Sequence, residues 1–144
     1  MADVVLDANV LIAHFDQHDS LHGQASALLQ SLREREHDVQ LLDFVMNEAV
    51  SVLCRRAAQR STYPPELETI LGKILVLYDD GEIEFLSGQI EQHFRSIIEV
   101  VRESSGRLNF NDATLCVLQR QGVIAEVATF DQELARYPGF RAWA

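Results

Sequence analysis

Four acidic residues stand beside apolar segments, in positions that could bring them together at one edge of a sheet. Asp7 and Asp131 each directly follow a short apolar run, Glu48 lies early in a helical pattern, and Asp112 lies in the first turn of a later one. Carboxylates crowded together repel one another and stay ionised at neutral pH only when a cation compensates them. Oxygen ligands suit hard cations such as Mg²⁺ or Mn²⁺. The chemistry of such a site is metal-assisted hydrolysis of a phosphodiester.

The elements that must position these acids are short apolar runs that alternate with helical patterns of period 3.6. This alternation predicts a parallel sheet with helices on both faces and all strand carboxyl ends at one edge, where ligands bind. The predicted strands span 3–6, 39–42, 83–86 and 125–129, with a short edge strand near Phe140. The predicted helices span 8–15, 21–36, 44–60, 65–79, 88–104, 110–121 and 132–136, with Ser20 and Asn109 among the N-caps.

Each acid also has a purely structural explanation. Asp7 and Asp131 can cap the helices that follow them, and Asp112 stands three residues after Asn109, the spacing of a capping box. Glu48 can be a solvent-facing helical residue. The metal-site interpretation therefore depends on all four acids meeting at one edge of the sheet.

The composition fits an ordinary globular domain. The 144 residues are 47% hydrophobic, so we expect residues 1–144 to form one domain with a substantial core. The net charge of −10 argues against nucleic-acid binding through a broad positive field, but not against a nuclease whose metals and local arginines hold the phosphate. No signal peptide or membrane span is predicted. Cys54 and Cys116 are expected to be buried thiols in helices, which indicates a cytoplasmic setting.

The acidic positions match a known family. Residues 4–12, 47–50, 109–113 and 128–131 resemble the motifs of the PIN-domain ribonucleases, most closely the small stand-alone members that act as VapC-type toxins. Each motif is degenerate alone, but the four occur in order across nearly the whole chain. The resemblance implies a PIN-like three-layer α/β/α sandwich around a central, mainly parallel sheet of four to five strands.

The same resemblance implies a catalytic, metal-binding cluster. Its central ligands for Mg²⁺ or Mn²⁺ would be Asp7 and Asp112, with Glu48 and Asp131 more distant or acting through water. The resemblance also implies an RNA substrate, a homodimer and, for a toxin, a separate antitoxin protein whose tail inserts near the acids.

Three polar residues near the acids have assigned roles. Asn9 and Thr129 match small polar positions of the family that help to orient the acids. Asp43 is a departure, because relatives often have Ser or Thr there. We expect Asp43 to be an N-cap, although an extra acid near the site can alter metal binding.

Arginines and histidines supply further candidates. Arg55 and Arg56 are candidate RNA contacts, because they follow Glu48 in one helical pattern and arginine binds phosphate through a planar fork. Arg55 is the better placed, since it shares a helical face with Glu48. The alternative is that these residues and Arg60 form a solvated helix end. His14, His18 and His22 would share a face of one continuous helix, as metal ligands can, but a loop expected at 16–20 breaks that register.

Other functions stay open. A stand-alone PIN nuclease in RNA processing would use the same acids, and a non-catalytic PIN-like binding module would not need them. A phosphatase of the haloacid-dehalogenase type needs a second Asp where this chain has Asn9, and a late Lys, whereas the lone Lys73 lies mid-helix. The apolar faces over 67–78 and 90–101 are expected to be mostly core, with some surface left for a dimer interface.

Overall fold

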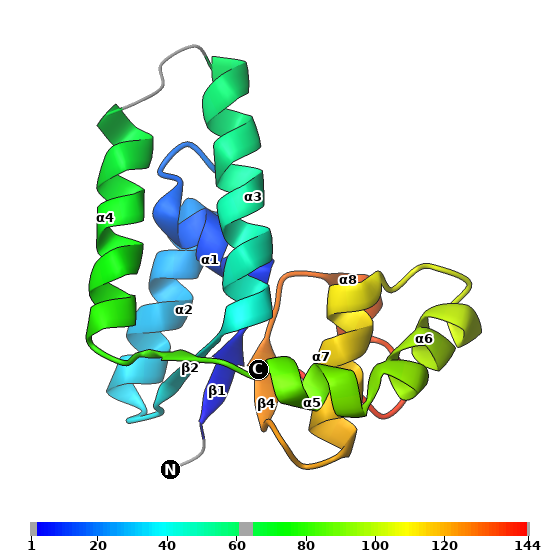
Figure 1. Cartoon of the computed structure of the whole chain (residues 1–144). Helices are drawn as coiled ribbons and strands as arrows, with labels where there is room; N and C mark the ends of the chain where they lie inside the picture. The colour runs from blue at the N-terminus through cyan, green and yellow to red at the C-terminus, as the bar shows by residue number, and fades with distance from the viewer. Residues whose placement is uncertain (1–2, 61–64, 144) are drawn as a thin grey trace.

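The structure is a computed structural model that describes residues 3–60 and 65–143. Its strands form one sheet in the order β3-β2-β1-β4, and every neighbouring pair is parallel (Figure 1). The strands are β1 (Val4–Leu6), β2 (Val39–Leu42), β3 (Ile83–Glu84) and β4 (Glu126–Ala128). The helices are α1 (Ala8–Phe15), α2 (His22–Glu34), α3 (Asp43–Arg60), α4 (Pro65–Asp79), α5 (Ser87–Gln92), α6 (Phe94–Glu103), α7 (Phe110–Arg120) and α8 (Gln132–Ala135).

The direction of the crossovers places helices on both faces of the sheet. The chain moves from β1 to β2 to β3 through α1–α4, and then returns across the sheet to β4 through α5, α6 and α7. Because parallel crossovers are right-handed, this reversal puts the two helix groups on opposite faces. Figure 1 shows α1–α4 gathered on one side of the strands and α5–α8 on the other. The predicted three-layer α/β/α sandwich is confirmed, with a parallel sheet of four strands.

The central strand β1 is buried on both faces, as its uninterrupted apolar run requires. The core cluster joins Val10 and Val45 from one helix layer to Leu115 and Leu118 from the other. This packing fixes the carboxyl end of β1 and therefore the acid that follows it. None of the helices in the described ranges is both long and apolar enough to cross a bilayer.

Two predicted N-caps differ from the structure. Ser20 does not cap α2, because the helix starts one residue later, at His22, without a side-chain cap. In the turn before it, the carboxylate of Asp19 accepts the amide of Leu21 at 2.8 Å. Asp43 is the first residue of α3, and its buried carboxylate accepts the amide of Leu86 at 3.1 Å. Its described contact therefore ties the start of α3 to the start of α5.

Three predicted elements are shorter or broken. The helix expected over 88–104 is interrupted at His93, between α5 and α6. The strand expected over 83–86 has two residues, and the edge strand expected near Phe140 is a single bridge between Val127 and Ala142. The prediction of a break over 61–65 falls almost entirely outside the described residues.

Some residues predicted to be buried are exposed. Tyr78, Phe94 and Ile98 were expected to face the core, but their exposed fractions are 58%, 53% and 37%. Cys116 is buried as predicted, whereas Cys54 is exposed, so the prediction of two buried thiols is wrong for Cys54. A period of 3.6 assigns a residue to a face of its helix, but it does not determine whether a neighbouring element extends far enough to cover that face.

Candidate active site

The carboxyl ends of the central strands meet where the chain reverses direction across the sheet. β1 lies between β2 and β4, and the connections that leave β1 and enter β4 run on opposite faces. Such a switch point leaves a crevice that binds ligands in open α/β sheets. Asp7 follows β1 there, and Thr129 and Asp131 follow β4. The amide of Asp7 donates to the carbonyl of Ala128 at 3.0 Å, which holds the two strand ends side by side.

Asp7 is 3% exposed and is the N-cap of α1. Its Oδ1 accepts the amide of Ala8 at 2.7 Å, and its Oδ2 accepts the hydroxyl of Thr129 at 2.7 Å. Because the single hydroxyl hydrogen of Thr129 goes to Asp7, the hydroxyl oxygen is left to accept. It accepts the amide of Asp131 at 3.0 Å and Nδ2 of Asn9 at 3.2 Å. Thr129 therefore links two of the acids.

Asn9 joins the first turn of α1 to the segment that follows β4. Its Nδ2 also lies 3.4 Å from Oδ2 of Asp7, and its Oδ1 accepts the amide of Phe130 at 3.0 Å. An Asp at this position would lose the donor and would place a second carboxylate against Asp7. The amide of Asn9 thus orients Asp7 without adding charge.

The predicted caps at Asp112 and Asp131 are confirmed. Asn109 Oδ1 accepts the amide of Asp112 at 2.9 Å, and Asp112 Oδ2 accepts the amide of Asn109 at 3.4 Å, which completes a capping box at α7. Asp131 Oδ1 accepts the amides of Glu133 and Leu134 at 2.9 and 3.4 Å. In each cap only one carboxylate oxygen accepts backbone amides, so the other oxygen is available for a second role.

Glu48 reaches the site from α3, and Asn111 is a neighbour to which sequence reasoning assigned no role. The half-buried Glu48 accepts a hydrogen bond at Oε2 from Nδ2 of Asn111, at 3.2 Å. Asn111 stands directly before Asp112 in a stretch that had been matched to the family. Nothing local in the sequence indicates that this turn of α7 faces α3, so its partner could not be predicted.

The four acids lie close enough for their charges to interact. Burial raises the pKa of the Asp112 carboxyl to about 7, and the negative charges of Asp7, Asp131 and Glu48 add to the shift. Burial likewise raises the pKa of the Asp7 carboxyl to about 6. The hydrogen bond from Thr129 opposes that second shift, and the charges of Glu48 and Asp131 add to it. No basic side chain is among the principal causes of either shift.

Three of these carboxylates keep one oxygen free. Within the described residues, no hydrogen bond reaches Oδ1 of Asp112, Oδ2 of Asp131 or Oε1 of Glu48. Every buried side-chain nitrogen or oxygen in that part of the chain has a hydrogen-bond partner, so these three oxygens reach solvent. The site therefore presents acidic oxygens to solvent, and none of the four acids forms an ion pair with a described residue.

This donor set fits a hard divalent cation. All of its ligand atoms are oxygens, and its negative charge is unbalanced, the combination that Mg²⁺ and Mn²⁺ prefer. Within residues 3–60 and 65–143, no group of three or more His, Cys, Asp or Glu side chains is arranged so that it could hold a metal ion. Binding of an ion would therefore require the carboxylates to draw together or to act through water.

A family model described as the PIN domain matches residues 4–139. The chain belongs to the PIN domain family. The match spans all four acidic positions, and it confirms the family recognised from the motifs. A comparison with curated protein sequences found no significant match.

Two solved structures share the fold of this PIN domain. VapC20 of Mycobacterium tuberculosis, a toxin that cleaves the sarcin-ricin loop, aligns with a TM-score of 0.66 at 20% identity over 95% of each chain. PAE2754 of Pyrobaculum aerophilum aligns with a TM-score of 0.59 at 19% identity, over 98% of this chain and 83% of that one. At these identities the similarity establishes the fold.

The arginines that follow Glu48 in this PIN domain have different surroundings. Arg55 is exposed and forms no ion pair with a described residue. Arg56 donates to Asp16 at 2.9 Å and to Asp19 at 2.7 Å, and Arg60 donates to both oxygens of Asp16 at 2.9 and 2.8 Å. Arg56 therefore holds the loop between α1 and α2, whereas Arg55 is unengaged by the described part of the chain.

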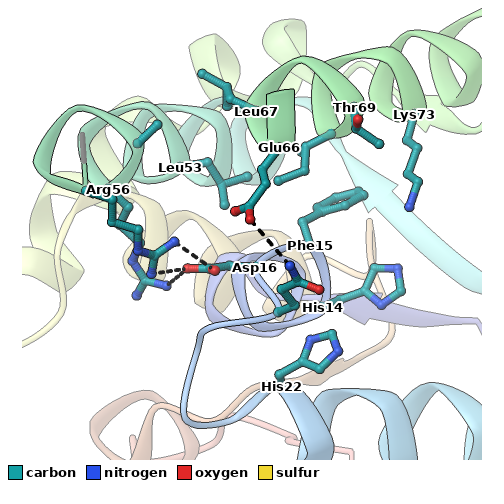
Figure 2. Close-up of a pocket in the computed structure, with 14 residues that line it drawn as sticks. His14, Phe15, Asp16, His22, Leu53, Arg56, Glu66, Leu67, Thr69 and Lys73 are labelled. Carbon is teal, nitrogen blue, oxygen red and sulfur yellow. Dashed lines mark hydrogen bonds and ion pairs between the residues drawn. The ribbon is translucent and has the colours of Figure 1, made fainter. Parts of the chain in front are cut away.

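The histidines lie apart from the acid cluster. A cavity of about 400 Å³ opens between α1, α3 and α4, and none of the four acids lines it (Figure 2). His14, His22 and Lys73 lie together at one end of it. Burial lowers the pKa of His14, and the charges of His22 and Lys73 lower it further. The loop expected at 16–20 is confirmed, and His18 stands in it, 3.4 Å from Glu66.

Proposed function

We propose that this PIN domain is a metal-dependent endoribonuclease that hydrolyses RNA phosphodiester bonds, and that it is the toxin of a toxin–antitoxin pair. The observation that carries the proposal is the cluster of four carboxylates at the switch point of the sheet. Burial and mutual repulsion raise the pKa of Asp7 and Asp112 towards neutrality. A cluster of this kind is electrostatically unfavourable until a cation joins it.

The four acids, Asp7, Glu48, Asp112 and Asp131, are the residues that would hold Mg²⁺ or Mn²⁺, with Asp7 and Asp112 as central ligands. When bound, such an ion supplies Lewis acidity for phosphodiester hydrolysis. The protein contributes orientation: Thr129 fixes the rotamer of Asp7, and the capping box fixes that of Asp112. Since the two caps at Asp112 and Asp131 engage one oxygen each, the other oxygen is left for the ion.

The RNA substrate is proposed from the fold and the acid cluster together. VapC20, which has the same fold at 20% identity, is a toxin that cleaves the sarcin-ricin loop. Fold similarity alone does not transfer function, so the acids carry the argument and the fold supports it. A toxin of this class would act in the cytoplasm and would be inhibited by a separate antitoxin protein. We treat residues 1–144 as one domain, because core residues from both halves of the chain form a single cluster.

We also propose that the chain forms a homodimer. Four large apolar side chains at the end of α4 and just after β3 are 56–62% exposed, namely Leu75, Val76, Tyr78 and Phe85. The rings of Tyr78 and Phe85 lie in edge contact, with their centroids 6.2 Å apart, and exposed apolar side chains that lie together are typical of interaction sites. Sedimentation equilibrium should give twice the mass of the 16.3 kDa chain. A monomer at micromolar concentration would contradict this part of the proposal.

The experiment that tests the nuclease uses a mixed RNA pool with Mg²⁺ or Mn²⁺, with EDTA, and with each ion restored in excess. Wild type should cleave only with the ion, and Asp112→Asn should lose about 10²- to 10³-fold in rate, the equivalent of about 3–4 kcal/mol. Asp80→Asn, at an exposed acid in the turn after α4, is the matched control and should match wild type. Cleavage that EDTA and Asp112→Asn leave unchanged would overturn the metal mechanism, and binding of RNA without cleavage would favour a non-catalytic module.

A further inference from the structure

Glu48 is held differently from the other acids of the cluster. Asp7, Asp112 and Asp131 each accept at least one backbone N–H, a donor whose position the start of a helix fixes. Among the hydrogen bonds of the described residues, Glu48 accepts only from the side chain of Asn111, at 3.2 Å. The position of its carboxylate therefore depends on one side-chain amide.

Without the hydrogen bond from that amide, the carboxylate of Glu48 would tend to move away from the site. Glu48 has three side-chain torsions, and its charge repels Asp7 and Asp112, since it contributes to the raised pKa of both. Repulsion and rotamer entropy would together favour conformations that carry its carboxylate into solvent. To keep the carboxylate of Glu48 at the cluster, a hydrogen-bond donor there must offset both the repulsion and the rotamer entropy.

A neutral amide suits this task better than a charged donor. A lysine or arginine at position 111 could also bond to Glu48, but its charge would cancel part of the negative charge that attracts a cation. The amide of Asn111 donates a hydrogen bond and leaves the charge of the cluster unchanged. It also joins α7 to α3, which lie on opposite faces of the sheet.

We propose that Asn111 is a positioning residue, which keeps the carboxylate of Glu48 on the acid cluster and so completes the cation site. This inference rests on the proposed function, because it assigns Asn111 to the same site. In this role Asn111 acts through Glu48 and does not itself contact the cation or the RNA.

The test is a double-mutant cycle on Mn²⁺ affinity and on cleavage. Isothermal titration of the full-length protein with Mn²⁺ should show affinity about 10- to 100-fold weaker in Asn111→Ala, the range found for residues that orient metal ligands. Glu48→Ala should lose at least as much. Because Asn111 acts through Glu48, adding Asn111→Ala to Glu48→Ala should change the affinity less than twofold further. The rate of RNA cleavage should follow the same pattern.

The matched control is Gln59→Ala, at an exposed amide near the end of α3 whose side chain has no described hydrogen bond. It should bind Mn²⁺ and cleave RNA as wild type does, and the melting temperatures of all variants without metal should show that each is folded. An active wild type with an unaffected Asn111→Ala would overturn the inference alone, as would losses that simply add in the double variant. A wild type that neither binds Mn²⁺ nor cleaves RNA would overturn the proposed function and the inference with it.

Discussion

Asp7 and Asp16 lie at opposite ends of α1 and are both little exposed to solvent, with 3% and 4% of their surface exposed. Their pKa values nevertheless move in opposite directions. Burial raises the pKa of Asp7 to about 6. Burial would raise that of Asp16 too, but hydrogen bonds from Arg60 and Arg56 outweigh it and lower the pKa to about 2.

The difference between the two sites is the source of the positive charge. The Asp16 site consists of Asp16, Asp19, Arg56 and Arg60. Its two arginines balance the charge of the two acids and join α3 to the loop after α1. Among the described residues, no basic side chain is among the principal causes of the pKa shifts in the acid cluster around Asp7, and the proposed function assigns the balancing charge to a bound cation. Low solvent exposure alone therefore does not set the direction of the pKa shift, whereas the charges of the neighbouring side chains do.

The largest expected effect is the response of the two sites to an external cation. Mn²⁺ at 100 times its dissociation constant should stabilise the wild type by about 2.7 kcal/mol. The same addition should have little effect on Asp112→Asn and a full effect on Asp16→Asn. Thermal melts with increasing Mn²⁺ measure this directly. Equal stabilisation of both variants would show that the ion binds somewhere other than the acid cluster.

Removal of one charge should have opposite effects on stability at the two sites. Without metal, Asp112→Asn keeps the capping bond and removes an uncompensated buried charge, so the free energy of unfolding should rise by on the order of 1–2 kcal/mol. Asp16→Asn leaves two arginines without their acceptor. It should cost about 1–2 kcal/mol, the lower part of the range for charged hydrogen bonds, because both guanidinium groups are one-third exposed. Urea unfolding in EDTA at pH 7 gives both values, and changes of the same sign would contradict the comparison.

The two sites should also respond oppositely to pH. The folded chain binds the protons of Asp7 and Asp112 more tightly than the unfolded chain, so their contribution to stability falls as pH rises from about 4 to about 7. The contribution of Asp16 is complete above about pH 4 and is lost as pH falls towards 2. The difference in stability between wild type and each Asn variant, measured from pH 2 to pH 8 in EDTA, isolates each contribution. A flat difference for Asp112→Asn between pH 4 and pH 7 would contradict the first assignment.

The smallest expected effect separates two adjacent arginines of α3. Arg55→Ala should raise the KM for RNA by about two- to fivefold and reduce the salt dependence of binding by about one phosphate contact, with little change in stability. Arg56→Ala should instead lower the melting temperature, because Arg56 is bound to Asp16 and Asp19. RNA binding at several salt concentrations, compared with melting curves, distinguishes the two. An unchanged salt dependence in Arg55→Ala would remove Arg55 from the RNA surface.

The local sequence was sufficient for most elements and for several contacts of the site. The apolar runs at 3–6 and 39–42 predicted strands, and the caps at Asp7, Asn109 and Asp131 follow from the side chains of the residues themselves. Ser20 shows the limit of this reasoning, because α2 starts one residue later than its position as a cap requires. Exposed apolar residues such as Phe94 show another limit, since a helical period says nothing about what covers the helix.

By itself, the sequence determined the order of strands and helices, the three-layer fold and the four acidic positions, because these depend on local patterns and on the handedness of crossovers. Only the tertiary structure decided which acids have a counter-charge. Arg60 meets Asp16 across 44 positions of the chain, and Asn111 meets Glu48 across 63. Such pairs depend on how helices pack on the sheet. The same packing places two arginines beside Asp16 and places Asp7 near other carboxylates.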